Sequence, residues 1–338
     1  MKKNTWQGKN GPLLIAEIGG NHEGSFNYAK KLLNLGKLSG VDVLKFQIYQ
    51  GSTLVNRKIS PERYNHFRKF ELTKKQHLYI ADMCEESGLK YLASVWNKSD
   101  LKWAQKKMDF FKIGSGDLTA YDQIDALCRY KKPILLSTGL AKMNEVKNTI
   151  DFIKSRGNYY KNRQNIAIMQ CTSSYPTKNN EINLDVIKSF QKFGYEVGYS
   201  HHAKSSFPLE IAYVLGANIF EFHFTDTRKN KNFRDHKISL TSLKVKNLIK
   251  KIHLIKKIRG SSLKKPTYNE IKSQHTETFR RGVYLNRDLK KGTLIKKTHL
   301  VTLRPENGIS AKNYFKIINK KLRRNIKKYE KFDFKDLF

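Results

Sequence analysis

The sequence predicts an α/β fold, a (β/α)₈ barrel followed by a small β-rich domain. Two observations carry this prediction. From residue 12 to about 258, eight short apolar runs alternate with longer segments of helical periodicity, and after residue 278 the pattern changes to short alternating runs. Continuous apolar strands separated by helices are typical of a parallel sheet that is covered on both faces. Eight such units in about 250 residues match a closed barrel in both number and length.

The apolar runs predict the strands, which cover residues 12–18, 41–48, 90–96, 109–115, 133–138, 165–171, 195–200 and 218–224. Between them, four segments place apolar residues at i, i+3 and i+4, which predicts helices. These segments are residues 26–40, 73–88, 118–130 and 145–157. An open, doubly wound sheet is the alternative fold, but no predicted strand is followed by the G-x-G-x-x-G phosphate loop of that fold.

The pattern divides the chain into three parts. Residues 1–258 form the predicted barrel, and residues 259–278 are polar and turn-rich, which indicates a linker. Residues 279–338 carry short alternating runs broken by Lys-Lys-Gly and Glu-Asn-Gly, which predicts a small β-rich domain. A module of this size has little core of its own, so we expect it to dock against another surface.

The composition fits a globular chain with a sizeable core. Of the 338 residues, 39% are hydrophobic and 12% are aromatic. These values exclude disordered, collagen-like and low-complexity proteins. No run approaches the roughly 18 apolar residues that a membrane span needs, and the N-terminal segment lacks the apolar region of a signal peptide. We therefore expect a soluble, cytoplasmic protein without a membrane partner.

The net charge is strongly positive, because 66 Lys and Arg residues stand against 29 Asp and Glu residues, which gives +37. Such a charge is typical of proteins that bind nucleic acid or a membrane surface. The lysines, however, are scattered in twos and threes along almost every segment. Nucleic-acid binding needs a contiguous footprint, so we expect no nucleic-acid partner. The positive field would instead attract a phosphorylated or carboxylated small substrate.

Polar residues close most of the predicted strands. In a barrel of this type the active site is built at the carboxyl ends of the strands. The residues at these ends are Glu17, Lys45, Gln47, Lys112, Ser115, Ser137, Thr138, Cys171 to Tyr175, Ser200, His202, Glu221 and His223. An unpaired charge would be costly at such a position, so we expect these groups to contact one another or a ligand.

Lys45 and Lys112 stand inside apolar runs, where a buried ammonium group needs an anion beside it. Three interpretations are open. Each lysine forms a structural ion pair with Glu17 or Glu221, or the two lysines bind the phosphate and carboxylate of a substrate with help from serine hydroxyls. The third interpretation is a Schiff-base lysine, as in aldolases.

His202 and His223 follow the seventh and eighth predicted strands. Neighbouring strands would hold the two imidazoles side by side, where they can bind one divalent metal and leave open positions for water or substrate. The alternative is that each is an ordinary core or surface histidine.

Nine short motifs follow one another along the chain. They are IAEIGGNHEGS (15–25), VLKFQ (43–47), FKIGSGDL (111–118), LLSTG (135–139), QCTSSYPT (170–177), GYSHHA (198–203), EFHFT (221–225), RDHKISL (234–240) and RPENGIS (304–310). In this order and spacing they resemble the sialic acid (N-acetylneuraminate) synthase family, which includes the legionaminic and pseudaminic acid synthases. The resemblance covers essentially the whole chain.

The resemblance implies a (β/α)₈ barrel followed by an antifreeze-like (SAF) domain, and a domain-swapped homodimer in which that domain covers the partner's active site. It implies condensation of phosphoenolpyruvate with an N-acylated mannosamine or a related deoxy sugar, with release of phosphate. It also implies a divalent metal cofactor, Mn²⁺ or Mg²⁺.

Matching the motifs residue by residue implies roles for the strand-end side chains. The implied phosphoenolpyruvate contacts are Lys45, Lys112, Ser115, Ser137 and Ser200. The implied sugar contacts are Gln47, Ser173, Tyr175, Asp235 and Arg304. The implied metal ligands are His202 and His223, and the implied acid/base or water-orienting carboxylate is Glu17.

The chain also departs from the motifs of this family. His201 and Ala203 flank His202 where relatives commonly have Asp and Thr, and Phe222 replaces a usual basic residue. The segment before Asp235 is one residue longer and lacks Gly-Pro, and the third predicted strand ends in Ser-Val-Trp-Asn. These departures leave the sugar contacts and the surroundings of the metal open. The RDHKISL run is more similar to sialic and legionaminic acid synthases than to pseudaminic acid synthases.

The leading hypothesis is therefore a metal-dependent synthase that joins phosphoenolpyruvate to an amino sugar. Two alternatives remain, a Schiff-base aldolase that uses Lys45 or Lys112, and a non-catalytic basic protein that binds nucleic acid or polysaccharide. The sequence does not identify the sugar acceptor, the metal, or a role for the net charge beyond solubility.

Overall fold

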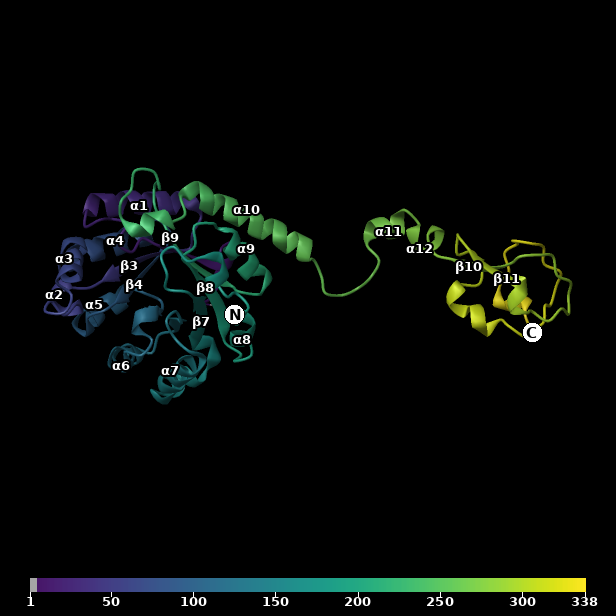
Figure 1. Cartoon of the computed structure of the whole chain (residues 1–338), viewed down its shortest axis with the longest axis horizontal. Coiled ribbons are helices and arrows are strands. Elements are labelled where there is room, and N and C mark those ends of the chain that lie inside the picture. Colours follow the sequence, from purple (N-terminus) through teal and green to yellow (C-terminus); the bar gives the residue numbers. More distant parts are fainter. Residues whose placement is uncertain (1–4) are drawn as a thin grey trace. The chain divides into compact units, whose positions relative to one another are not determined.

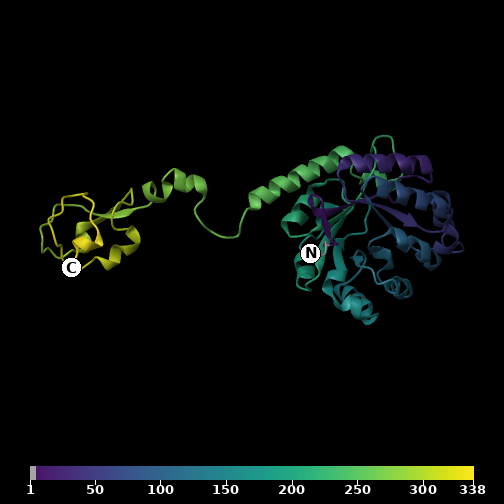
Figure 2. The ribbon, with the colours of Figure 1, turned by 180° about the vertical axis from the view of Figure 1, so that it is seen from behind.

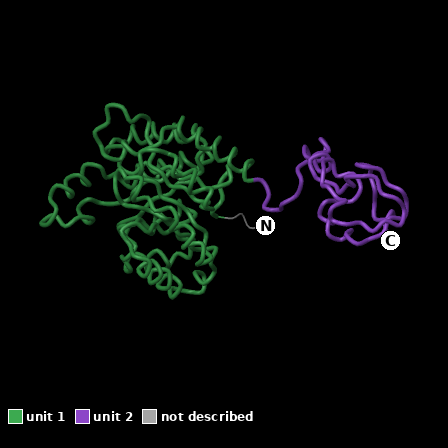
Figure 3. The backbone as a smooth tube through the Cα atoms, turned by 45° about the vertical axis from the view of Figure 1, so that its right-hand side comes forward, with its two compact units in different colours: residues 1–259 green, residues 260–338 purple. Residues whose placement is uncertain are grey.

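The computed structural model describes residues 5–338 and divides into two compact units, residues 1–259 and residues 260–338 (Figure 3). Each unit has its own hydrophobic core. Among the described residues, no helix is both long and apolar enough to cross a membrane.

The first unit is built around eight parallel strands. They are β2 (Gly11–Glu17), β3 (Val43–Ile48), β4 (Lys90–Val95), β5 (Phe111–Ile113), β6 (Ile134–Ser137), β7 (Ile166–Cys171), β8 (Glu196–His201) and β9 (Ile219–His223). Their order in the sheet is β4-β3-β2-β9-β8-β7-β6-β5. The end strands β4 and β5 lie next to each other, so the sheet is nearly closed. The predicted barrel is confirmed, because each apolar run forms one strand.

Helices surround the strands as an outer ring (Figure 1). They are α1 (Phe26–Ser39), α2 (Gly51–Leu54), α3 (Pro61–Phe70), α4 (Lys74–Glu86), α5 (Leu101–Ala104), α6 (Tyr121–Cys128), α7 (Met143–Ser155), α8 (Val186–Gln191), α9 (Phe207–Val214) and α10 (Ser242–Arg259). Side chains cap two of these helices: Ser25 accepts a hydrogen bond at the start of α1, and Thr73 with Gln76 forms a capping box on α4. Figures 1 and 2 show that α1 and α10, the first and last helices of the ring, run side by side.

The strand register brings polar residues to one level at the carboxyl ends. Glu17 of β2 pairs in register with Lys45 of β3 on one side and with His223 of β9 on the other. Ser200 of β8 pairs in the same way with Glu221 of β9. A short strand, β1 (Gln7–Gly8), pairs antiparallel with the first residues of β2 at the opposite end. The mouth at the carboxyl ends is therefore where charged side chains meet.

The second unit is small and has short strands. β10 (Gly282–Leu285) and β11 (Leu300–Leu303) pair antiparallel, and isolated bridges extend the pairing. Its core includes Val283, Ile317 and Phe332, which are fully buried. Two short helices, α11 (Tyr268–Lys272) and α12 (His275–Thr278), lie in the segment where the sequence predicted only a linker. A capping box of Thr267 and Glu270 explains the first of them.

Candidate active site

Two lysines and two glutamates meet at the mouth of the barrel. The Lys45 ammonium group lies 2.7 Å from a carboxylate oxygen of Glu17 and 3.7 Å from one of Glu221. The Lys112 ammonium group lies 3.7 Å from the other oxygen of Glu221. All four side chains are at least 90% buried. The geometry expected of a structural ion pair is therefore present, in a group of four charges that sums to zero.

Neutral groups complete the surroundings of Lys112 and Glu221. Lys112 donates hydrogen bonds to Ser137 Oγ at 2.7 Å and to the carbonyl oxygen of Ile113 at 3.0 Å. Ser200 donates to Glu221 at 3.0 Å. The second oxygen of Glu221, Oε2, is buried without a hydrogen bond. Ser137 and Ser200, two of the phosphoenolpyruvate contacts that the family resemblance implied, thus lie in contact with the charged group.

The four charges have shifted pKa values. Burial, with the charge of Glu221, raises the pKa of Glu17 to about 7 against the pull of Lys45. Burial also acts to raise the pKa of Glu221, but Lys112 and Lys45 outweigh it and hold that pKa at about 2. Burial lowers the pKa of Lys112, whereas the two carboxylates outweigh burial and raise the pKa of Lys45. Glu17 is therefore the member of this group that can gain a proton near neutral pH.

The loop after β6 brings Ser115 and Ser173 together. The backbone N–H of Gly139 donates to Ser115 Oγ at 3.0 Å. A Cβ atom at position 139 would lie 2.4 Å from Ser173 Oγ and 2.7 Å from Ser115 Oγ, so only glycine allows this close approach. Ser115, a predicted phosphoenolpyruvate contact, and Ser173, a predicted sugar contact, thus lie close to one residue of this loop.

The imidazoles of His202 and His223 lie on neighbouring strand ends, with ring centroids 5.5 Å apart. The ring of Tyr175 lies 4.3 Å from the first and 5.9 Å from the second. His202 Nδ1 hydrogen-bonds the carbonyl oxygen of Thr172 at 2.8 Å. Since a carbonyl oxygen only accepts, Nδ1 carries a hydrogen, and in the neutral ring the lone pair is on Nε2. His223 Nδ1 is buried without a hydrogen bond, and burial lowers the pKa of His223 to about 4.

This histidine pair suits a divalent metal in its chemistry. Both imidazoles are buried at the mouth, and the carbonyl contact of His202 is the kind that orients a metal ligand. Within residues 5–338, no group of three or more His, Cys, Asp or Glu side chains is placed to hold a metal. Two protein ligands would leave the other positions of the metal to water or substrate.

Cys171, at the end of β7, links the histidines to a groove. Its Sγ lies 3.8 Å from His202 Nδ1 and 3.4 Å from Ser115 Oγ. Burial acts to raise the pKa of the Cys171 thiol, but His202 outweighs it and lowers that pKa to about 7. The same residue lines a groove of about 590 Å³ between the loops that follow β6 and β7, which Ser173 also lines. From the sequence, Cys171 was predicted only to lie at the end of a strand.

The predicted sugar contacts lie at several points. Gln47 donates to Glu17 at 3.0 Å. Asp235 is buried, with one oxygen 3.7 Å from His223 Nδ1 and the other accepting from Arg234 Nε at 2.9 Å. Arg304 belongs to the second unit, where its guanidinium group lies 6.0 Å from the ring of Phe279. Four of the five, Gln47, Ser173, Tyr175 and Asp235, therefore belong to the barrel unit.

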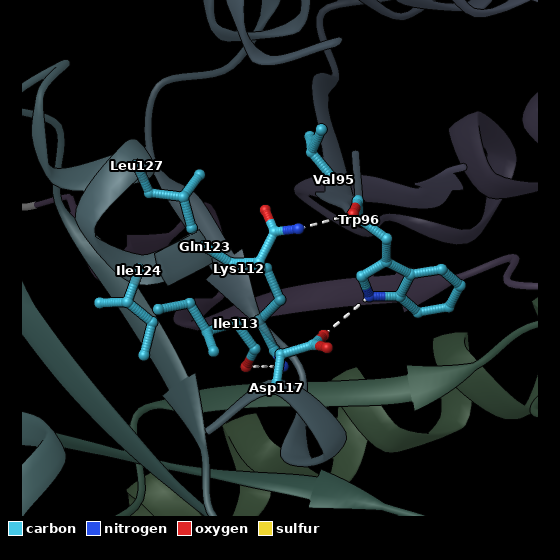
Figure 4. Close-up of a pocket in the computed structure, with 8 residues that line it drawn as sticks. All are labelled: Val95, Trp96, Lys112, Ile113, Asp117, Gln123, Ile124 and Leu127. Carbon is cyan, nitrogen blue, oxygen red and sulfur yellow. Dashed lines mark hydrogen bonds between the residues drawn. The ribbon is translucent and has the colours of Figure 1, made fainter. Parts of the chain in front are cut away.

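A small cavity beside Lys112 brings in residues to which the sequence assigned no role in the site (Figure 4). Its volume is about 10 Å³, room for about one water molecule. Trp96 donates from its indole N–H to Asp117 at 2.8 Å, and Gln123 donates to the Trp96 carbonyl oxygen at 2.9 Å. Burial raises the pKa of Asp117, while Lys112 and the Trp96 hydrogen bond act in the other direction. The departure Ser-Val-Trp-Asn thus supplies a donor to a carboxylate near the lysines.

Two other departures from the family motifs turn out to be neighbours. His201 of β8 pairs in register with Phe222 of β9. His201 Nδ1 lies 3.3 Å from the hydroxyl of Tyr199, and burial lowers the pKa of His201 to about 3. Because successive residues of a strand face opposite sides, His201 and Phe222 face away from Ser200, Glu221 and the mouth. The second imidazole therefore lies behind the proposed ligand, in the apolar layer between strands and helices.

Fold and site together define a (β/α)₈-barrel enzyme whose mouth combines paired lysines, carboxylates and imidazoles, joined to a small second unit. A family model described as the NeuB family matches residues 32–264, and a model of the SAF domain matches residues 280–330. The chain belongs to the NeuB family and carries a SAF domain. The family resemblance drawn from the nine motifs is confirmed.

Named relatives agree with this assignment. The N,N'-diacetyllegionaminic acid synthase of Campylobacter jejuni is 32% identical over 332 residues, covering 94% of this chain and 98% of that protein. The pseudaminic acid synthase of the same species is 27% identical over 332 residues, covering 93% of each. In structure, an N-acetylneuraminic acid (sialic acid) synthetase from Leptospira borgpetersenii has a TM-score of 0.72 at 24% identity, covering 79% of this chain and 92% of that one.

Proposed function

We propose that the protein is a nonulosonic acid synthase, a transferase that condenses phosphoenolpyruvate with an N-acylated amino sugar and releases phosphate. The observation that carries the proposal is the pair of buried lysines beside two carboxylates and two imidazoles, in a chain of the NeuB family. Paired lysines in a water-poor mouth suit a small substrate that bears both a phosphate and a carboxylate.

Lys45 and Lys112 bind the anionic groups of phosphoenolpyruvate in this proposal, and Ser115, Ser137 and Ser200 donate hydrogen bonds to them. The lysines are held in advance by Glu17 and Glu221 at 2.7 to 3.7 Å. Charges fixed in this way need little reorganisation when the substrate enters. The substrate anions would take over from the carboxylates as partners of the lysines.

In the reaction, C3 of the enol group attacks the aldehyde carbon of the sugar and forms the new C–C bond. Water then adds at C2, and the C–O bond to phosphate breaks, so that one phosphate leaves for each water consumed. Glu17 acts as the acid/base or water-orienting group. Burial raises the pKa of Glu17 to about 7, which suits a carboxyl that gains and gives a proton near neutral pH.

His202 and His223 would hold Mn²⁺ or Mg²⁺, which when bound supplies Lewis-acid polarisation of the sugar's aldehyde oxygen. The chain's own part is to orient the imidazoles. The Thr172 carbonyl oxygen fixes the ring of His202, and Tyr175 packs against both rings.

The acceptor contacts are proposed to be Gln47, Ser173, Tyr175, Asp235 and Arg304. Identity is higher to the relative named for N,N'-diacetyllegionaminic acid than to the one named for pseudaminic acid, at 32% against 27%. The diacetamido trideoxy sugar that leads to N,N'-diacetyllegionaminic acid is therefore the first acceptor to test, beside N-acetylmannosamine.

We also propose that the active site is shared in a domain-swapped homodimer in the cytoplasm, with Arg304 of one subunit at the sugar held by the other. A mixture of inactive Arg304→Ala and Lys45→Ala chains would then regain about a quarter of wild-type activity after subunit exchange, because half the chains form heterodimers and each heterodimer has one intact site. If activity does not recover although subunit exchange is proven, the proposal of an active site shared between subunits is contradicted.

The test of function is phosphate release from phosphoenolpyruvate with a panel of N-acyl hexosamines and diacetamido 6-deoxy sugars, with Mn²⁺ or Mg²⁺ present. We expect release that depends on one class of sugar, with one phosphate per product. Release with no sugar in the panel, combined with borohydride trapping of a pyruvate-like substrate on a lysine, overturns the proposal in favour of an aldolase.

A further inference from the structure

Residues 226–239, which form most of the connection from β9 to α10, have one anchored side and one side at the mouth, and we name this segment the mouth loop. Its first residue, Asp226, accepts hydrogen bonds from Tyr28 at 2.6 Å and Lys31 at 2.8 Å, both on α1. Its last residue, Ser239, accepts from Asn21 at 2.8 Å. Both ends are thus held by the segment that follows β2 and by α1.

A buried histidine anchors the middle of the mouth loop. His236 is fully buried and its Nε2 lies 3.0 Å from a carboxylate oxygen of Glu23, while its Nδ1 lies 2.7 Å from the hydroxyl of Thr225. A carboxylate only accepts, so Nε2 carries the hydrogen, and in a neutral ring Nδ1 accepts from Thr225. The ring therefore bridges the segment after β2 and the residues that follow β9, with both nitrogens bonded.

Aromatic packing holds the same loop at a second point. The ring of Phe233 lies 5.1 Å from that of Phe70 and 5.6 Å from that of His66, both on α3. Gly20 lies under it, since a Cβ atom there would come within 2.8 Å of the Phe233 ring. Only the absence of a side chain at position 20 lets Phe233 seat this deeply.

Between these anchors, Arg234 and Asp235 face the mouth. The Arg234 guanidinium group lies 4.4 Å from the ring of Tyr175, and its Nε donates to Asp235. Asp235 in turn lies 3.7 Å from His223. The anchors adjoin the mouth residues directly, because Phe233 and His236 flank Arg234 and Asp235. A shift of either anchor would therefore move both.

We propose that Glu23, His236 and Phe233 are positioning residues that fix Arg234 and Asp235 against Tyr175 and His223, and so set affinity for the acceptor sugar without touching phosphoenolpyruvate. This inference rests on the proposed function. The lysines that hold the other substrate belong to β3 and β5, on which the mouth loop has no anchor among the contacts described above for residues 226–239.

The test uses two substitutions that disturb the anchors from opposite sides. Glu23→Ala removes the acceptor for His236, and Gly20→Ala drives a Cβ atom against Phe233. Each should raise KM for the sugar about tenfold, as expected when Arg234 or Asp235 loses one charge-assisted contact with the sugar. KM for phosphoenolpyruvate should stay within about twofold of wild type. Glu23→Gln keeps an acceptor oxygen for His236 and should restore the sugar KM to within about twofold of wild type.

A matched control separates positioning from stability. His77→Gln alters another buried histidine that bonds a hydroxyl, that of Tyr91 at 2.9 Å, away from the mouth loop. It should leave both KM values unchanged. Hydrogen–deuterium exchange of residues 226–239 gives a readout free of catalysis, and we expect faster exchange in Glu23→Ala and Gly20→Ala but not in Glu23→Gln or His77→Gln.

Unchanged exchange, or KM values for the two substrates that rise together, overturns the inference. Absence of phosphate release by the wild-type enzyme contradicts the proposed function instead, and the exchange measurement then still decides whether these residues anchor the loop.

Discussion

Strands β8 and β9 have two faces that differ sharply. The face toward the mouth carries Ser200, Glu221 and His223, with a carboxylate oxygen and a ring nitrogen that lie near charged groups but have no hydrogen bond. The face toward the helices carries His201 and Phe222, both fully buried. The same two strands thus hold an ionic layer on one side and an apolar layer on the other.

This difference explains which sequence changes the site can accept. On the mouth side each charge depends on the others, so a change there leaves a buried ion without a partner. On the helix side this chain replaces both members of a cross-strand pair, His201 for Asp and Phe222 for a basic residue, so no lone charge is left. The mouth keeps the family residues because charges cannot be removed from it one at a time.

Metal removal and ligand substitution should give the largest effect. We expect EDTA to abolish phosphate release, and His202→Ala to abolish it without unfolding the chain, because two imidazoles are the only protein ligands proposed for the metal. His201→Phe, one residue away but on the helix face, should keep most of the activity. Phosphate release and far-UV circular dichroism measure both. Full activity of His202→Ala, or loss of activity in His201→Phe alone, contradicts the difference between the mouth face and the helix face of these strands.

Substitution of the lysines should give the next largest effect. Lys45→Ala and Lys112→Ala each remove a desolvated partner of an anion, a loss of about 2 to 5 kcal/mol in binding. KM for phosphoenolpyruvate should therefore rise far more than KM for the sugar. Phe46→Leu is the matched control, because Phe46 faces the other way, with its ring 6.0 Å from that of Tyr91. An unchanged KM for phosphoenolpyruvate in both lysine variants refutes the proposal that Lys45 and Lys112 bind its anionic groups.

The fold and the mouth were largely predictable from the sequence. Eight apolar runs form the eight strands, and the alternation within a strand brings Lys45, Glu17 and Glu221 to one end. The parallel register then places these side chains at one level, because neighbouring strands that end together present their last side chains side by side.

Contacts between distant loops were not predictable in this way. Glu23 and His236 lie 213 residues apart, and no periodicity links them. The Trp96–Asp117 contact joins two loops that follow neighbouring strands, and its direction depends on side-chain rotamers. The direction of His201 could have been predicted, since alternation alone places it opposite its neighbour His202.

A charge on the helix face should destabilise the fold without a specific effect on catalysis. His201→Asp or Phe222→Lys alone buries an unpaired charge, a loss of about 3 to 5 kcal/mol in the free energy of unfolding. The double variant should recover about 1 to 3 kcal/mol of the summed loss, because the two positions are cross-strand neighbours. Urea unfolding of the four proteins gives the coupling, and strictly additive losses would show that the two side chains do not meet.

The smallest effect concerns pH and a histidine away from the mouth. Burial lowers the pKa of His77 to about 3 in the folded chain, whereas the unfolded chain takes up the proton near pH 6.5. Between these values the unfolded state binds one more proton, so the free energy of unfolding contributed by this group is full above pH 6.5 and falls by about 1.4 kcal/mol per unit as the pH drops. In His77→Gln this dependence is absent. The stability difference between wild type and variant should therefore shift by about 2 kcal/mol in the variant's favour from pH 7 to pH 5.

Urea unfolding followed by tryptophan fluorescence measures this shift in the barrel, because Trp6, Trp96 and Trp103 all lie in that unit. A difference that stays constant with pH would mean that His77 takes up its proton at the same pH in the folded barrel as in the unfolded chain, and that the helix face tolerates a charge as the mouth does.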